Sequence, residues 1–301
     1  MPERPDLDVY VDHLDRRLLG ARLEGVRIAS PFVLRTAEPA PERLVGETIR
    51  GVRRIAKRLV LDVGEAHHVV IHLMITGRLH WRKPGAALPK RGGLAAFDVT
   101  GGPVGDGTLT LTESAKKKRA AIHLCTGDEA LAAFETPGVE VAPDGFETFR
   151  AAVTRHNHTL KRALTDQRIL RGIGNAYSDE ILWTARLSPA KQTARLTDAE
   201  LGALFFACNT VLEDWTARLA AETGDAFPEK VTAFHDAMAV HGRYRLPCPR
   251  CGAPVQRIVY AENEANYCAA CQTGGRLLAD RALSRLLHGN WPKKLEELDG
   301  V

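Results

Sequence analysis

The sequence predicts an α+β protein of two domains. Apolar residues recur at helical spacing in residues 5–19, short β-type runs fill residues 22–125, and the pattern after residue 148 is helical again. A chain of 301 residues is long enough for about two domains, and an apolar fraction of 45% can supply a core to each. We therefore expect a β-rich N-terminal domain that opens with a helix, followed by a helical C-terminal domain.

The N-terminal half contains one helix and a series of strands. Leu7, Tyr10, Leu14 and Leu18 mark the buried face of the first helix. The β-type runs that follow are RLEGVRIA, KRLVLDVG, HHVVIHLMI, LAAFDVT, GTLTLTE and AAIHLC. Because Gly, Pro and Asp separate these runs at short intervals, we expect a sandwich or barrel of antiparallel strands.

The domain boundary is expected within residues 126–148, which hold two prolines and three glycines. Helices are expected near residues 147–155, 158–169, 176–186, 197–221 and 229–238. Leucines at helical spacing predict one more amphipathic helix over Arg276–His288.

Four cysteines form the most specific pattern in the chain. Cys248, Cys251, Cys268 and Cys271 follow the spacing C-x2-C-x16-C-x2-C. Each C-x-x-C pair can present two thiolates from one tight turn, and the intervening residues can form a hairpin that joins the pairs. Two disulfides or four unrelated thiols are the alternatives, but this spacing favours a structural Zn²⁺ with four sulfur ligands. Single cysteines at positions 125 and 208 lie in apolar surroundings and are expected in the core.

Basic residues gather in four places although the net charge is only +4. The groups are Arg50, Arg53, Arg54, Lys57 and Arg58; Lys116, Lys117, Lys118 and Arg119; Arg155, Lys161, Arg162, Arg168 and Arg171; and Arg243, Arg245, Arg250 and Arg257. Any one group could be ordinary solvated surface. Four groups, one of them beside the cysteine pattern, favour a nucleic-acid backbone as partner.

The chain has the composition of a cytoplasmic protein. No apolar run approaches the roughly 20 residues that a membrane helix needs, and the N-terminus lacks the apolar segment of a signal peptide. Unpaired thiols beside a zinc site fit a reducing compartment.

A glycine-rich turn lies between two predicted helices. Gly172 and Gly174 permit positive φ angles and close approach of another backbone, and Asn175 can cap the helix that follows. Exposed amides at a helix N-terminus bind anions such as phosphate. Lys161 and Arg162, one helix upstream, would face the same phosphates.

Four segments together resemble the formamidopyrimidine-DNA glycosylase and endonuclease VIII family. Leu164–Glu180 is similar to its helix–two-turn–helix, the cysteine pattern to its zinc finger, Met1-Pro2-Glu3 to its catalytic N-terminus, and Arg53–Leu59 to the strand that bears its catalytic lysine. The resemblance covers roughly residues 1–272 in the family's order. It implies a catalytic β-sandwich domain (1–130), a helix–two-turn–helix domain (131–240), a zinc finger (241–272) and an extension (273–301).

The resemblance also implies a function. Such enzymes bind damaged double-stranded DNA as monomers in the cleft between their domains, flip a damaged base out of the stack, cut its glycosidic bond and nick the abasic strand. Removal of Met1 would leave Pro2 with a secondary amine, which can attack the sugar C1′ and form a Schiff base. Glu3 would supply a proton, and Lys57 would contact the lesion phosphate. Asp6 stands where the family usually has Glu.

Three departures indicate a divergent member of the family. Asn263 replaces the zinc-finger arginine that assists δ-elimination, and Glu262 and Glu264 make the hairpin tip acidic. The family's loop with an Arg and a Phe that fill the gap becomes Thr112–Ala120, where Lys117 is one of several basic residues. A histidine expected near position 95 is absent. Met74 or Ile75 could still enter the stack as an apolar wedge.

Two alternatives stay open at this point. A binding protein that kept the scaffold but lost turnover would also explain the missing arginine and wedge, although Pro2, Glu3 and Lys57 oppose it. A zinc-ribbon factor unrelated to repair would leave the glycine turn and the β-rich half as coincidence. The sequence does not indicate which lesion is removed.

Overall fold

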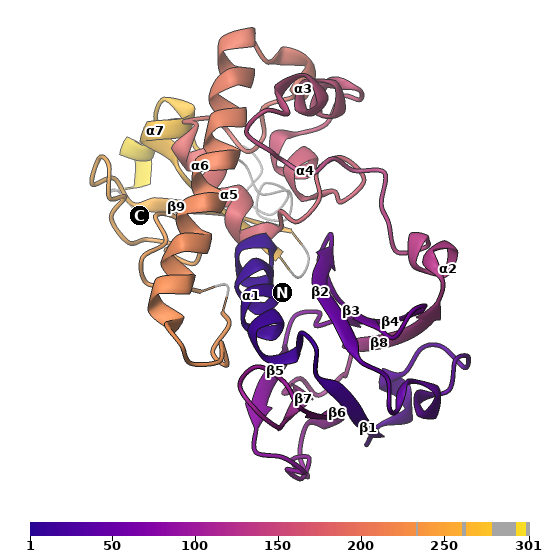
Figure 1. The fold of residues 1–301 in the computed structure, drawn as a ribbon. Coiled ribbons are helices and arrows are strands. Elements are labelled where there is room, and N and C mark those ends of the chain that lie inside the picture. Colours follow the sequence, from indigo (N-terminus) through magenta and orange to yellow (C-terminus); the bar gives the residue numbers. More distant parts are fainter. Residues whose placement is uncertain (233, 261–262, 279–292, 299–301) are drawn as a thin grey trace. The chain divides into compact units, whose positions relative to one another are not determined.

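The computed structural model describes residues 1–232, 234–260, 263–278 and 293–298, and the chain forms two compact units (Figure 1). The first unit holds Met1–Glu135 and Trp215–Thr232. The second holds Thr136–Asp214 and the described residues from 234 onward. The long helix α6 (Asp198–Thr223) therefore begins in the second unit and ends in the first.

The first unit is built from helix α1 (Arg4–Leu18) and two antiparallel four-stranded sheets. One sheet has the order β1-β6-β7-β5, with bounds Arg22–Ile28, Gly93–Thr100, Gly107–Glu113 and Gly77–Arg82. The other has the order β2-β3-β4-β8, with bounds Ile49–Ile55, Arg58–Val63, His67–His72 and Ala121–Thr126. Short helices η1 (Pro31–Val33), η2 (Pro41–Leu44) and α2 (Asp128–Ala132) complete the connections.

One hydrophobic core joins the sheets and the helix. Leu14 of α1, Leu61 of β3 and Leu111 of β7 belong to the same buried cluster. Helix α1 lies against β2 (Figure 1). Alternate residues of β7 point into this core, as the period of two in its sequence requires. The prediction of antiparallel strands preceded by a helix is confirmed.

The second unit is mainly helical. Its helices are α3 (Phe146–Thr154), α4 (Leu160–Thr165), α5 (Asn175–Thr184), the first part of α6, α7 (Ala269–Thr273), η3 (Thr193–Arg195) and η5 (Leu295–Leu298). The hairpin of β9 (Val255–Tyr260) and β10 (Asn263–Cys268) carries the second cysteine pair at its end. The two-domain α+β prediction is therefore confirmed.

Two helix predictions differ from the structure. The helix expected over residues 158–169 ends at Thr165, because Asp166 has an extended ψ of 112° and its carboxylate receives the amide of Arg168. The helix expected near 229–238 is wrong for the described residues of that range, which form turns and extended chain. At the residue after this range, the backbone amide of Ala239 donates a hydrogen bond to the carboxylate of Glu180.

Most of the amphipathic helix predicted over Arg276–His288 lies outside the described residues. Among the helices that the structure describes, none combines the length and the apolar character needed to cross a bilayer.

Candidate active site and metal centre

The first turn of α1 fixes the N-terminal residues in a buried position. Pro2 and Glu3 are both buried, and Glu3 is only 3% exposed. The amide of Glu3 donates to Oδ2 of Asp6 at 2.8 Å, and the carbonyl of Glu3 accepts from the amide of Leu7 at 3.0 Å. Chain ends usually fray, whereas this end is held by two hydrogen bonds within one helical turn.

The terminal amine lies in a charged and partly desolvated environment. Burial is the main cause that lowers the pKa of the Met1 amine, and the positive charges of Arg78 and Lys57 lower it further, while Glu3 and Asp6 act in the opposite direction. These four side chains are therefore within electrostatic reach of the amine. The sequence singled out Glu3 as a proton donor and Lys57 as a contact of the lesion phosphate, and the charges of both act on the N-terminal amine.

Lys57 lies in the two-residue turn between β2 and β3. Ala56, the residue before it, has a positive φ of 51°, which directs the chain into the next strand. The Lys57 side chain is 7% exposed. A lysine that is nearly buried beside an amine and two carboxylates differs from the ordinary exposed lysine of a basic strand.

Asp6 is a buried carboxyl with a strongly shifted pKa. Burial, together with the charge of Glu3, raises its pKa from 3.8 to about 7, although the hydrogen bond from the Glu3 amide acts against the rise. Asp6 can therefore carry a proton near neutral pH. Its geometry places it one helical turn after Glu3, where it fixes the backbone of that residue.

The loop between β4 and β5 presents an apolar tip. Met74 has a positive φ of 53° and Ile75 is 54% exposed. Gly77 closes the loop by donating to the carbonyl of Leu73 at 2.9 Å, and a Cβ at position 77 would lie 2.2 Å from that oxygen. Only glycine fits there, so the loop shape is fixed by the sequence.

Arg78 was not among the residues that the sequence singled out. Its guanidinium donates to the carbonyls of Ile75 at 3.2 Å and Gly77 at 2.6 Å, so it stiffens the apolar loop from behind. The same charge acts on the terminal amine and on Asp6. An arginine one residue after the loop glycine was the available signal, but its reach across to α1 depends on the fold.

The basic loop of residues 114–120 is held by a buried carboxylate. Glu113 is 2% exposed and accepts the amides of Arg119 at 2.8 Å and Ala120 at 3.0 Å, together with the hydroxyl of Thr76 at 3.2 Å. One carboxylate thus joins the basic loop to the apolar loop. Lys117 is exposed at the tip of the basic loop.

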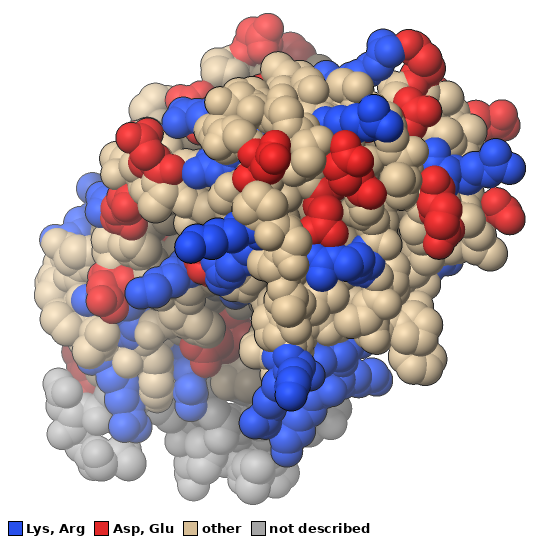
Figure 2. Space-filling model, turned by 60° about the horizontal axis from the view of Figure 1, so that its bottom comes forward, with Lys and Arg blue, Asp and Glu red and all other residues tan. Residues whose placement is uncertain are grey.

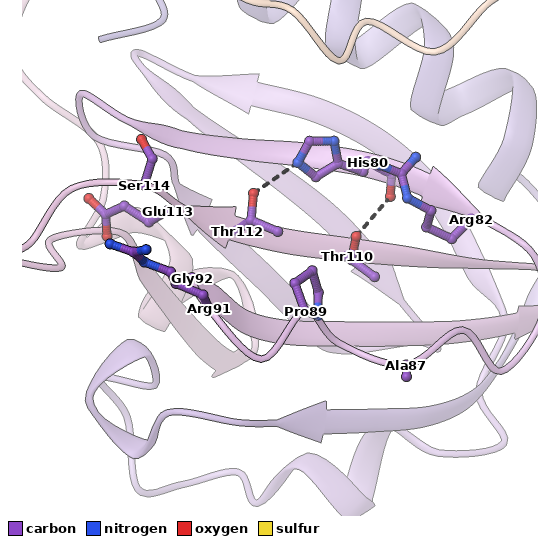
Figure 3. A pocket seen from close by; sticks show the side chains of 10 residues that line it. All are labelled: His80, Arg82, Ala87, Pro89, Arg91, Gly92, Thr110, Thr112, Glu113 and Ser114. Atoms are coloured by element: carbon purple, nitrogen blue, oxygen red, sulfur yellow. Dashed lines mark hydrogen bonds between the residues drawn. The ribbon is translucent and has the colours of Figure 1, made fainter.

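A pocket of about 350 Å³ lies beside these loops, over strands β5 and β7 (Figure 3). Its floor carries His80, whose ring contacts Thr112 Oγ1 at 2.8 Å and Glu229 at 3.2 Å. Arg82 is also paired with Glu229. Since these polar groups are already paired within the protein, the pocket's lining serves to fix the segment after α6 to strand β5.

In the second unit, Lys161 points to the first turn of α5. Its amine donates to the Asn175 carbonyl at 2.7 Å, to Ser178 Oγ at 2.8 Å and to Asp179 Oδ1 at 2.5 Å. The other oxygen of Asp179 contacts His241 Nδ1 at 2.8 Å. Lys161 is only 11% exposed at its side chain, so its charge is used within the protein. Arg162, the next residue, is exposed.

The glycine turn has positive φ at Gly172 but not at Gly174, whose φ is −136°, and its helix cap differs from the prediction. Gly172 has φ of 85°, and its amide donates to Gln167 Oε1 at 2.9 Å. Gly174, not Asn175, is the N-cap of α5. The Asn175 amide group instead donates to the carbonyl of Glu264 in β10 at 2.8 Å. The turn and the cysteine hairpin are thereby joined directly, which the sequence could not show.

The four cysteines converge at one point. Their sulfur atoms all lie within 4.8 Å of one another, as a tetrahedral metal site requires. Burial alone would raise the pKa of Cys248, but hydrogen bonds from the Trp183 indole and from the amides of Arg250 and Cys251 lower it to about 7. These residues fit a structural Zn²⁺ with four sulfur ligands, and the zinc prediction is confirmed.

The hairpin tip has the composition noted in the sequence. Asn263 begins β10 and pairs with Tyr260, and the next residue, Glu264, forms an ion pair with Arg257 of β9 at 3.3 Å. Figure 2 shows lysine and arginine side chains gathered in several patches on one face, with acidic side chains scattered over the same face. The first basic group is largely neutralised, because Arg53 pairs with Asp62 at 2.9 Å and Arg54 with Asp8 at 2.5 Å.

Family models match three successive parts of the chain. Residues 1–130 match the formamidopyrimidine-DNA glycosylase N-terminal domain, residues 138–223 its H2TH domain, and residues 245–274 a zinc finger found in FPG and IleRS. An uncharacterized formamidopyrimidine-DNA glycosylase-like protein of Mycobacterium tuberculosis is 41% identical over 128 residues, which is 42% of this chain and 79% of that protein. The formamidopyrimidine-DNA glycosylase of Chloroflexus aggregans is 30% identical over 279 residues, 90% of this chain and 98% of the relative.

Solved structures share the fold. The Lactococcus lactis Fpg in complex with DNA containing an abasic site superposes with a TM-score of 0.78 at 24% identity, over 90% of this chain and 99% of that one. A MutM complex with DNA containing carbocyclic 8-oxo-G superposes with a TM-score of 0.77 at 23% identity, over 90% of this chain and 100% of that one.

The raised pKa of Asp6 predicts a pH dependence of stability. The folded state keeps a proton on Asp6 up to about pH 7, whereas the unfolded chain loses it near 3.8. The stability that this proton contributes is present at low pH and is lost as the pH rises through about 7. Replacing Asp6→Asn, which can still accept the Glu3 amide, should reduce the difference in Tm between pH 5 and pH 8. Asp12→Asn, at an exposed site on the same helix, should leave that difference unchanged. An unaltered difference in Asp6→Asn would contradict the assignment.

The cysteine geometry predicts one zinc ion per chain. Cys268→Ser removes a buried sulfur ligand, so elemental analysis of the purified variant should show loss of the metal. Cys208→Ala removes a thiol outside the cluster and should retain the full zinc content. Equal zinc content in both variants would refute the four-cysteine site.

Proposed function

The chain belongs to the formamidopyrimidine-DNA glycosylase family, and from this membership we propose that it is a base-excision-repair DNA glycosylase with AP lyase activity. Its substrate is damaged double-stranded DNA. The observation that carries the proposal is the buried N-terminus, where Pro2 and Glu3 are both buried and where burial and the charges of Arg78 and Lys57 lower the pKa of the Met1 amine. Once Met1 is removed, the Pro2 amine would lie near the same charges, which favour a neutral nucleophile at physiological pH.

In the proposed reaction, Pro2 becomes the first residue when Met1 is removed. The lone pair of its amine attacks C1′ of the damaged nucleotide, and the glycosidic bond breaks with its electron pair moving to the base. Glu3 donates the proton that the opening sugar or departing base requires. The attacking nitrogen loses its proton and the C1′–O4′ bond breaks, with its electron pair moving to O4′, which is protonated; C1′ and the nitrogen then form an iminium. The iminium acidifies the C2′ hydrogen. Loss of that proton to a base gives an enamine, whose electrons expel the 3′ phosphate by β-elimination. Water then hydrolyses the iminium and regenerates the amine.

Lys57 and Asp6 support this chemistry in different ways. We propose that Lys57, held at 7% exposure close to the amine, contacts the phosphate next to the lesion and favours its departure. Asp6 fixes the amide of Glu3, so its role is to position the proton donor. With a pKa near 7, it can also share protons with the site.

The remaining residues of the sequence prediction are proposed to contact DNA. Met74 and Ile75 form the apolar tip that would enter the base stack, and Lys117 and Arg162 are exposed cations for backbone phosphates. Gly172, Gly174 and Asn175 build the turn at the N-terminus of α5. We propose that Lys161 acts there by holding the α5 turn, because its amine is already bonded to that turn. Asn263 is proposed to lie near the DNA backbone, where its neutral side chain supplies no positive charge.

Covalent trapping tests the nucleophile. Borohydride added to protein and abasic duplex should give a covalent complex, because it reduces the iminium that Pro2 forms. Pro2→Gly should reduce trapping by at least about tenfold, and Glu3→Gln should block base removal, since general acid catalysis contributes about 10²–10⁴-fold. Arg43→Gln, on the exposed short helix η2, serves as the control that traps normally. Binding of abasic DNA over hours with no trapping, after mass spectrometry has shown that Met1 is absent, would instead support a non-catalytic binding protein.

The products of strand cleavage test the effect of having Asn263 in place of the zinc-finger arginine. We expect mainly the β-elimination product, because Asn263 lacks a guanidinium and Glu264 adds negative charge nearby. Electrophoretic separation of the β and β,δ ends from a single abasic duplex measures this ratio. Asn263→Arg should raise the δ fraction, while Asn263→Gln should not. Abundant δ product from the unmodified protein would show that another residue performs the second step.

A further inference from the structure

We propose that Tyr244, Arg245 and Arg257 form a phosphate-binding surface at the base of the cysteine hairpin, and that its ligand is the DNA backbone. The inference rests on the proposed function for the identity of the nucleic acid. Arg245 and Arg257 belong to the basic group beside the cysteine pattern, but neither the reaction nor the family resemblance assigned a specific role to any of the three residues. Below they are called the Tyr244 cluster.

The cluster places two guanidinium groups against one aromatic ring. The Arg257 guanidinium carbon lies 4.3 Å from the centre of the Tyr244 ring, and that of Arg245 lies 5.2 Å from it. Both arginines are exposed and Tyr244 is half-buried. Arg257 belongs to β9, whereas Arg245 precedes the first cysteine pair, so two separate segments bring their charges to the same ring.

Stacking leaves the edges of the guanidinium planes available. A guanidinium that lies over a ring keeps its N–H groups at the periphery, where they can form paired hydrogen bonds with a phosphate. Glu264 holds Arg257 at 3.3 Å, and Asn266 donates to the other oxygen of Glu264 at 3.2 Å. This ion pair orients Arg257 before any ligand binds. Two cations against one carboxylate leave the cluster with excess positive charge.

The backbone of Arg245 supplies an independent argument. Arg245 has a φ of 70°, in the left-handed region that glycine adopts without strain. Its amide donates to the carbonyl of Val255 at 2.9 Å, and the Val255 amide donates to Leu246 at 2.9 Å, so the turn is held in this conformation. Glycine would satisfy the turn better than arginine. The turn therefore does not explain the arginine side chain. Its contact with the Tyr244 ring is consistent with a role in the phosphate-binding surface.

The Tyr244 cluster lies further down the hairpin than Asn263, the position where the family has an arginine. Asn263 pairs with Tyr260, while Arg257 pairs with Asn266 three steps further down the ladder. Three residues of antiparallel strand span roughly 10 Å. The proposal thus moves the cationic contact of the hairpin from its tip to its base, where it would bind a different phosphate along the strand.

The test measures how DNA binding depends on salt. A duplex with a tetrahydrofuran abasic analogue, labelled with a fluorophore, is titrated at several salt concentrations with wild type, Arg257→Gln and Arg245→Gly. Each variant should reduce the slope of log K against log salt by about one, because each removes a phosphate contact. Arg245→Gly should melt no lower than wild type, since glycine relieves the positive φ. Arg257→Lys should keep most of the slope but bind more weakly than wild type.

The matched control is Arg186→Gly. Arg186 is also exposed, also in the second unit and also at a positive φ, 56°, but it contacts no ring among the described residues. Its slope should equal that of wild type. Unchanged slopes for both cluster variants, or an equal loss in Arg186→Gly, would overturn the proposal.

Borohydride trapping on the same variants separates this inference from the proposed function. If wild type binds DNA with the expected slopes but never traps, the cluster stands and the lyase proposal fails. If trapping succeeds while the cluster variants keep the wild-type slope, only the cluster proposal fails.

Discussion

The hydrogen bond from the Glu3 amide to the Asp6 carboxylate is the contact on which the candidate active site depends. It closes the first turn of α1, whose apolar face, including Leu7 and Leu14, is buried in the core of the first unit. A helix held by its core face transmits that rigidity to its first residue. The terminal amine is consequently held in place, whereas an exposed chain end would sample many conformations. This arrangement buries Asp6, and burial disfavours its ionised form, which is why its pKa is raised.

The same device recurs at two other places. Glu113, 2% exposed, accepts two amides of the basic loop, and Glu180, 4% exposed, accepts the amides of Ala239, Val240 and His241. A buried carboxylate that receives several backbone N–H groups satisfies donors that irregular chain would otherwise leave unpaired. In each case a buried carboxylate fixes a short irregular segment that has no secondary structure of its own and that lies close in sequence to residues of the proposed function. Burial raises the pKa of Glu180 while those three amides oppose the rise, so hydrogen bonding makes the burial tolerable.

Local patterns in the sequence predicted the parts of the molecule that local physics determines. The spacing of Cys248 to Cys271, the apolar face of α1 and the alternation of the strands needed only neighbouring residues. The pairing of Lys161 with Asp179 could not be predicted, because both read as ordinary surface charges until α4 and α5 are packed. Arg78 was missed for the same reason, since the terminal amine and Asp6, on which its charge acts, lie in a different element. The helix expected near 229–238 is absent from the described residues of that range, and the side chain of Glu229 instead pairs with Arg82 of β5, 147 residues away in sequence.

Backbone strain provides a last connection between fold and function. Among the residues that the structure describes, four other than glycine have positive φ: Ala56, Met74, Arg186 and Arg245. Such conformations typically cost on the order of 1 kcal/mol each and persist where surrounding structure fixes them. Ala56 precedes Lys57, Met74 shapes the apolar loop, and Arg245 belongs to the Tyr244 cluster. Arg186 instead lies two residues after α5, which ends at Thr184. There its amide donates to the Trp183 carbonyl and the Leu187 amide donates to the Leu182 carbonyl, a hydrogen-bond pattern common at helix C-termini. Three of the four strained residues thus adjoin side chains that the proposed function uses, while the fourth has a sufficient structural cause. That difference is why Arg186 serves as a control for Arg245.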